Sequence, residues 1–206
     1  MRELEALKRR YEGHVPDLMG VRRRFAVLCP FVEIEGQTHL LFEVRAAGLR
    51  QAGEVCFPGG RMETGESAAE CAARETEEEL GIPASEIRIF AESDFQAGQD
   101  GLMMRATLGE ISPAGLAAMK PSEAEVAEVF TVPLEFFLHT PPELYTYELV
   151  PLLPEDFPYE TIGIPRDYKW QQGGETVPVY PWEGHPIWGL TGRITRHLMQ
   201  WMERWQ

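Results

Sequence analysis

The sequence predicts one domain that mixes α-helices with β-strands. Two apolar runs, at residues 25–35 and 38–44, carry the aliphatic and aromatic residues typical of strands and flank a turn at 36–37, as in a hairpin. A helix is expected at 67–81, where a capping-box pattern opens it and a glycine closes it, and a second helix from 189 to about 205. At 206 residues the chain can bury a stable core without a second domain.

The N-terminal 20 residues are expected to form a helix and a connector. Residues 1–12 are typical of a short amphipathic helix with Leu4, Leu7 and Tyr11 on its apolar side, which would pack on the body or at a dimer edge. The basic triplet at 22–24 begins the first strand. It either forms a solvated edge or faces a substrate phosphate.

Further strands and a short helix are expected after the 67–81 helix. Strands are predicted at 85–94 and 102–109, on either side of a turn at 97–101. A loop with a short helix at 111–121 should precede a strand-then-helix segment at 122–138. These elements complete the mixed α and β pattern.

Residues 139–182 form a proline-rich and aromatic-rich insertion, in which strands are predicted at 145–149 and 177–180. So many aromatic residues argue against disorder. The insertion has three interpretations: a substrate lid, a dimer surface or a packed satellite core. The final segment, 189–206, should be a helix with Thr191 as its N-terminal cap.

The composition excludes several classes of function. A net charge of −14 argues against sequence-independent nucleic-acid binding, which needs a basic face, but it permits a small polyanion bound by local cations. Three widely spaced cysteines match neither a disulfide framework nor a zinc pattern, as expected for reduced thiols in a cytoplasm. The sequence shows no signal peptide and no apolar run near 18 residues, so no membrane association is expected. The five histidines are scattered and none is assigned to chemistry.

The helix expected at 67–81 carries three carboxylates on one face. Glu75, Glu78 and Glu79 are spaced i, i+3, i+4 and would repel one another by about 0.2–0.5 kcal/mol per pair. A hard divalent cation would turn this repulsion into binding, and oxygen ligands suit Mg²⁺ or Mn²⁺. Arg74 lies one turn before Glu78 and is placed to hold its carboxylate. Pro58-Gly59-Gly60, before the helix, predicts a tight loop that approaches a ligand closely.

This stretch resembles the Nudix box, the signature of hydrolases that cleave a diphosphate linked to another moiety. The matching residues are Gly60, Glu66, Arg74, Glu75, Glu78, Glu79 and Gly81. Thr76 is the one departure, since the family usually has a bulky aliphatic residue there. The resemblance implies a Nudix α/β/α sandwich, in which a mixed sheet lies between helices and the box forms a loop–helix–loop. It also implies that the Gly60 carbonyl joins Glu75, Glu78 and Glu79 at the metal.

The segment before the box resembles an additional signature of the coenzyme A diphosphatases in this family. The matching residues are Leu40, Leu41, Arg45, Arg50, Gly53 and the run from Phe57 to Gly60. Glu43 and Ala46 stand where threonine and serine are expected, and the spacing from Arg50 to Gly53 is one residue short. The resemblance implies that Arg45 and Arg50 clamp substrate phosphates; ordinary surface arginines are the alternative. The stretch 187–191 resembles the same branch.

The resemblance implies metal-dependent hydrolysis of coenzyme A or its acyl derivatives to 4′-phosphopantetheine and adenosine 3′,5′-bisphosphate. Another nucleotide substrate, such as ADP-ribose or NADH, is the first alternative, and a non-catalytic nucleotide-binding regulator is the second. In many relatives a carboxylate in a later loop completes the metal shell or acts as base. Here Glu123 and Glu125 are the candidates for that position. The general base therefore remains open among Glu75, Glu79, Glu123 and Glu125.

Overall fold

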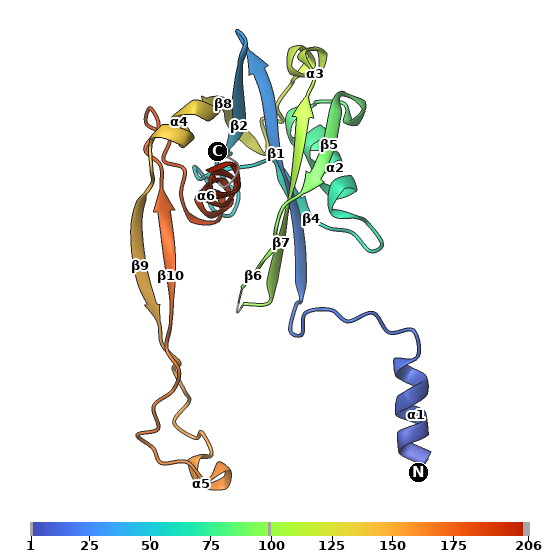
Figure 1. Ribbon diagram of the computed structural model, residues 1–206, viewed down its shortest axis with the longest axis vertical. Coiled ribbons are helices and arrows are strands. Elements are labelled where there is room, and N and C mark those ends of the chain that lie inside the picture. Colours follow the sequence, from blue (N-terminus) through green and yellow to red (C-terminus); the bar gives the residue numbers. More distant parts are fainter. Residues whose placement is uncertain (1, 99, 204–206) are drawn as a thin grey trace.

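The computed structural model describes residues 2–98 and 100–203 (Figure 1). It confirms the predicted mixture of helices and strands. The elements in chain order are α1 (Arg2–Tyr11), β1 (Arg23–Ile34), β2 (Gln37–Arg45), β3 (Val55–Cys56), β4 (Gly59–Arg61), α2 (Ala68–Leu80), the 3₁₀ turn η1 (Ala84–Glu86), β5 (Ile87–Glu92), β6 (Gln96–Ala97), β7 (Leu102–Ile111), α3 (Pro113–Ala118), β8 (Val126–Pro133), α4 (Leu134–His139), β9 (Glu143–Leu149), α5 (Tyr159–Ile162), β10 (Gly173–Val179) and α6 (Gly189–Glu203).

A mixed sheet occupies the centre of the molecule (Figure 1). Its main path is β3-β2-β1-β7-β5, with β4 beside β1, β6 beside β7 and β8 beside β2. β1 and β2 form the predicted antiparallel hairpin, whereas β7 runs parallel to β1. The hairpin turn falls at Glu35 and Gly36, which both have positive φ, one residue earlier than predicted.

Helices cover both faces of this sheet because successive residues of a strand point to opposite sides. Ala26 and Leu28 of β1 belong to a core cluster with Ala68, Cys71 and Ala72 of α2. Their neighbours Val27 and Cys29 belong to a second cluster, which includes Leu198 and Met199 of α6. The layering is the α/β/α sandwich that the resemblance to the Nudix family implies.

The C-terminal helix differs from the prediction at its start. α6 begins at Gly189, so Thr191 lies inside the first turn and the prediction that it caps the helix is wrong. Thr191 is buried, and its hydroxyl donates a hydrogen bond to the carbonyl of Val55 at 3.1 Å. A buried hydroxyl needs a partner, and the backbone of β3 provides it. Likewise, residues 85 and 86, predicted to begin the strand at 85–94, belong to the turn η1 instead.

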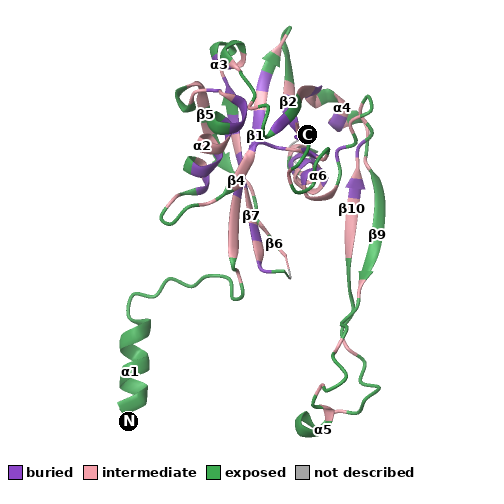
Figure 2. Ribbon diagram, turned by 180° about the vertical axis from the view of Figure 1, so that it is seen from behind, coloured by how far each residue is buried: buried purple, intermediate pink, exposed green. Residues whose placement is uncertain are grey.

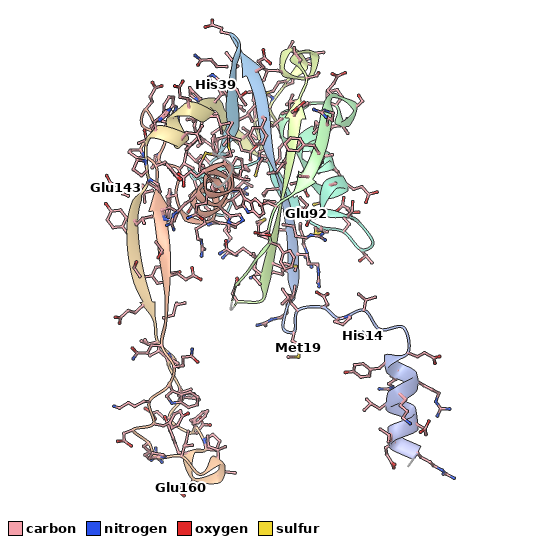
Figure 3. The ribbon with its side chains drawn as sticks, in the orientation of Figure 1. His14, Met19, His39, Glu92, Glu143 and Glu160 are labelled. Atoms are coloured by element: carbon pink, nitrogen blue, oxygen red, sulfur yellow. The ribbon has the colours of Figure 1, made fainter. Side chains whose placement is uncertain are left out.

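The N-terminal helix and the insertion extend away from the sandwich (Figures 1 and 2). α1 buries none of its residues, and Leu4, Leu7 and Tyr11 are exposed. The insertion forms an arm in which β9 pairs antiparallel with β10. Figure 3 shows Glu143 near the base of this arm and Glu160 at its far end. Tyr145 and Tyr147 on β9 are exposed, whereas the rings of Phe157, Tyr159, Tyr168 and Trp170 contact one another beyond the strands. The rings at the far end of the arm thus contact one another without being buried, whereas Tyr180 of the same insertion is buried in the core of the sandwich.

Two residues of the basic triplet at 22–24 form ion pairs, and the three cysteines are not joined in disulfides. Arg23 pairs with Asp100 at 2.8 Å and Arg24 pairs with Asp17, as a solvated edge would. Cys29, Cys56 and Cys71 are free. None of the helices within residues 2–98 and 100–203 combines the length and the apolar run needed to cross a bilayer.

Candidate active site

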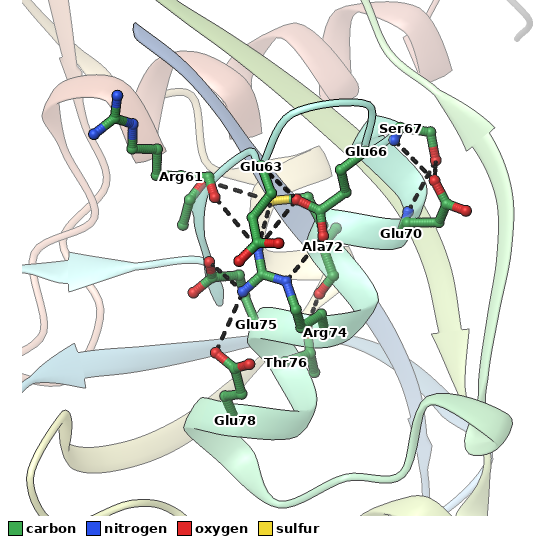
Figure 4. A network of polar contacts seen from close by, with 12 residues as sticks. Arg61, Glu63, Glu66, Ser67, Glu70, Ala72, Arg74, Glu75, Thr76 and Glu78 are labelled. Atoms are coloured by element: carbon green, nitrogen blue, oxygen red, sulfur yellow. Dashed lines mark hydrogen bonds and ion pairs between the residues drawn. The ribbon is translucent and has the colours of Figure 1, made fainter.

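The ends of α2 form as predicted. The Ser67 hydroxyl accepts a hydrogen bond from the Glu70 amide at 3.2 Å, and the Glu70 carboxylate accepts one from the Ser67 amide at 2.8 Å (Figure 4). At the other end Gly81 adopts the left-handed conformation, with φ of 67°. These caps set where the helix begins and ends.

Arg74 connects the loop before α2 with the acidic face of the helix (Figure 4). Its guanidinium binds Glu66 through two bonds of 2.9 and 3.1 Å and Glu75 through one of 2.8 Å. The predicted contact with Glu78 is present at 3.3 Å. The hydrogen bonds from Arg74 hold the pKa of Glu66 well below its usual value, at about 2. Arg74 therefore orients Glu75 and Glu78 while Glu66 anchors the arginine.

The two glycines of β4 lie against Glu75 and Glu79 of the helix. Glu79 is buried, and its Oε2 accepts a hydrogen bond from the Gly59 amide at 2.8 Å. A Cβ on Gly60 would lie 2.3 Å from Oε2 of Glu75, so only a glycine lets the strand approach this carboxylate so closely. The Gly60 carbonyl accepts a weak hydrogen bond from the Cys71 thiol at 3.7 Å. Burial, reinforced by the neighbouring charge of Glu43, raises the pKa of Glu79.

Glu43 of β2 is a carboxylate of the site that the sequence analysis did not assign. Its side chain is 1% exposed, and its Oε1 accepts a hydrogen bond from the Cys56 thiol at 3.3 Å. Burial raises its pKa, and the charges of Glu125 and Glu75 act in the same direction. The signal was present in the sequence, because an acidic residue inside the apolar run 38–44 is unusual for a buried strand.

The structure separates the remaining predicted residues into two groups. Arg45, at the end of β2, is close enough for its charge to favour the ionised forms of Glu43 and Glu79. Glu125 acts electrostatically on Glu43 and Glu75, and its carbonyl accepts a hydrogen bond from the Ala46 amide at 2.9 Å. Glu125 is itself exposed, as are the two other predicted residues, Arg50 and Glu123. Among the described residues, none of the hydrogen bonds or ion pairs joins either of those side chains to the site; Arg50 contributes its carbonyl to the Arg45 guanidinium, at 3.2 Å.

A cavity elsewhere in the molecule does not coincide with these carboxylates. It has a volume of about 560 Å³, lies between β6, β7, β10 and α6, and is lined in part by Arg193, Arg196 and His197. It therefore opens on the α6 face of the sheet, while Glu75 and Glu79 lie on α2 at the other face. Within residues 2–98 and 100–203, no three acidic, histidine or cysteine side chains converge into a ready-made metal site.

The family model of the NUDIX domain matches residues 22–153 of this chain. The chain belongs to the Nudix family. It is 29% identical over 181 residues to the mitochondrial coenzyme A diphosphatase NUDT8 of Homo sapiens, an alignment that covers 85% of this chain and 67% of the relative. It is 33% identical over 138 residues to the peroxisomal coenzyme A diphosphatase NUDT7 of Mus musculus, covering 65% and 56%. It is 32% identical over 178 residues to the uncharacterized Nudix hydrolase NudL of Escherichia coli strain K12, covering 85% and 81%.

The one departure from the Nudix box is accommodated within the helix. Thr76 is fully buried, where an aliphatic side chain is usual, and its hydroxyl donates a hydrogen bond to the Ala72 carbonyl at 2.6 Å. The polar atom is therefore satisfied within the Nudix helix itself. The substitution leaves the acidic face of the helix unchanged.

Proposed function

We propose that this Nudix hydrolase cleaves the diphosphate bond of coenzyme A or its acyl derivatives, giving 4′-phosphopantetheine and adenosine 3′,5′-bisphosphate. The observation that carries the proposal is the acidic face of α2, held by Arg74 and set against the glycine loop, with Arg45 at its edge. The choice of coenzyme A is supported by the upstream signature and by the relatives named coenzyme A diphosphatases.

The residues present fit a Mg²⁺ or Mn²⁺ cofactor. Glu75, Glu78 and Glu79 offer only oxygen ligands, which these hard cations prefer. Because Gly60 has no Cβ, the Glu75 carboxylate lies directly against the backbone of β4. When bound, such a cation supplies Lewis acidity and neutralises charge on the diphosphate oxygens. The Gly60 carbonyl and Glu123 are proposed as additional ligands; Glu123 is exposed, so it would have to turn toward the site.

The protein's own groups hold the carboxylates and accept a proton. Water attacks one phosphorus, a new P–O bond forms, and the bridging oxygen departs with the other phosphate. The proton lost by the water passes to a carboxylate. Glu79 is suited to this role because the Gly59 amide holds it in place and burial raises its pKa. Glu75, Glu123 and Glu125 are the other candidates for the base.

The two arginines of the upstream signature are proposed to contact the substrate. The charge of Arg45 acts on Glu43 and Glu79, which supports a role for this arginine in binding an oxygen of the diphosphate. Arg50 is exposed on the loop that follows, where its side chain is free to meet a phosphate farther out, such as the 3′-phosphate of coenzyme A.

The test is product analysis after incubation of the protein with coenzyme A, ADP-ribose or NADH in the presence of Mg²⁺ or Mn²⁺. Glu78→Gln is the inactive comparison. Glu77→Gln is the matched control, since Glu77 is an exposed carboxylate of the same helix that instead accepts a hydrogen bond from the Ala84 amide at 3.3 Å. We expect phosphopantetheine from coenzyme A, none with Glu78→Gln, and wild-type turnover with Glu77→Gln. Preferential cleavage of ADP-ribose or NADH would refute the coenzyme A assignment. Tight nucleotide binding without turnover would indicate a regulator.

A further inference from the structure

We propose that Glu43 is an additional ligand for the divalent cation of this site, supplied by strand β2 rather than by the Nudix helix. The inference rests on the proposed metal-dependent function and extends the ligand set beyond the box. It starts from the side chain of Glu43, whose burial costs free energy and which has no role in the reaction outlined above.

The Glu43 carboxylate is only half satisfied. Its side chain is 1% exposed, and its Oε1 accepts the hydrogen bond from the Cys56 thiol. Its Oε2 is buried and has no hydrogen-bond partner among the described residues. Buried polar atoms are nearly always paired, and an unpaired carboxylate oxygen is among the most costly exceptions. A group missing from the protein chain is therefore expected next to this atom.

The position of Glu43 indicates that the missing partner is the cation that the helix carboxylates would bind. Cys56 is the direct partner of Glu43 in the pairing of β2 with β3. Gly59, three residues later, donates its amide to Glu79. Three residues span at most about 11 Å, so Glu43 and Glu79 are both anchored to one short segment. Their charges repel each other, and the charge of Glu75 acts on both.

The identity of the missing group follows from charge and donor type. The carboxylates of Glu43, Glu75 and Glu79 are near enough for their charges to interact, although among the described residues they do not converge into a ready-made site, and the charge of Arg45 opposes those of Glu43 and Glu79. A threonine, which the upstream signature leads one to expect at position 43, would bring a neutral hydroxyl able to donate a hydrogen bond. A glutamate brings another negative oxygen ligand instead. Such a set suits a hard divalent cation better than a water molecule or an organic group.

The test measures metal binding and stability without relying on turnover. Mn²⁺ affinity is determined by electron paramagnetic resonance of the free ion, and thermal melting is recorded with and without Mn²⁺. The proteins are the wild type, Glu43→Gln, Glu43→Thr and the control Glu77→Gln. We expect both Glu43 variants to bind Mn²⁺ at least tenfold more weakly and to gain less in melting temperature from Mn²⁺. Without metal, they should melt at or above the wild-type temperature, because a buried charge has been removed.

Unchanged Mn²⁺ affinity in a folded Glu43 variant would overturn the proposal. So would a variant that melts lower than the wild type to the same extent with and without Mn²⁺, because that result indicates a structural role. If Glu43→Gln does not fold, Glu43→Thr provides the test instead, since threonine is the residue that the family signature leads one to expect there. If the wild type binds Mn²⁺ through Glu43 but does not cleave coenzyme A, the proposed function fails while this ligand assignment stands.

Discussion

Replacing Gly60 with alanine should damage the chemistry while sparing the fold. The added Cβ would lie 2.3 Å from Oε2 and 2.4 Å from Oε1 of Glu75. Ordinary contact begins near 3.4 Å, so the carboxylate must retreat by about 1 Å. The obstacle is the far end of a flexible side chain, and the φ of Gly60 is not positive, so the backbone tolerates alanine. We expect the free energy of unfolding to change by less than about 1 kcal/mol.

The expected kinetic effect is much larger. A displacement of about 1 Å at a reacting centre costs on the order of 100-fold in rate, which corresponds to about 2.7 kcal/mol. The assay is steady-state hydrolysis of coenzyme A with saturating Mg²⁺, set beside urea denaturation of the same preparation. Turnover of Gly60→Ala at the wild-type rate would falsify the argument that the glycine keeps Glu75 in place.

The neighbouring glycine is the matched control. A Cβ on Gly59 would lie 2.3 Å from the Ala26 carbonyl oxygen and 2.5 Å from the Cα of Val27, and Gly59 has φ of 152°. Because those atoms belong to the backbone of β1, they cannot retreat as a side chain does. Gly59→Ala should therefore destabilise the protein by about 1–3 kcal/mol, measured as a lower urea midpoint. If the two alanine variants lost equal stability, the distinction between side-chain and backbone contacts would be wrong.

Three further perturbations probe the helix and its anchoring. Ser67→Ala removes the N-terminal cap of α2 and should cost about 1 kcal/mol, a drop of roughly 2–4 °C in melting temperature by calorimetry. Glu66 has a lower pKa in the folded protein than in the unfolded chain, so its pairing with Arg74 stabilises the fold above pH 4.5 and is lost as the pH falls toward about 2. The difference in urea midpoint between the wild type and Glu66→Gln should accordingly vanish across that range; a difference that persists at pH 2 would contradict it. Arg74→Lys keeps the charge but loses the planar fork that joins Glu66 to Glu75, so kcat/KM for coenzyme A should fall about tenfold; an unchanged value would show that orientation by Arg74 is dispensable.

The helix that carries the box could be read from the sequence because its signals are local. Ser67, Glu70 and Gly81 lie next to the turns that they cap, and both ends formed where predicted. The spacing of Glu75, Glu78 and Glu79 sets their rotation about the helix axis through bonds between residues at most four apart. The apolar runs at 25–35 and 38–44 were equally local signals, and they predicted the hairpin of β1 and β2 within one residue at the turn.

Contacts between distant residues were decided by the tertiary structure alone. In the sequence, Glu43 was only a departure from a signature. In the structure, where β2 pairs with β3, it is a buried carboxylate near Glu79. The same packing left Arg50 and Glu123 exposed and moved Thr191 from a cap to a buried contact with β3. Local spacing cannot predict such outcomes, because they depend on which strands pair and on which side chains are then excluded from water.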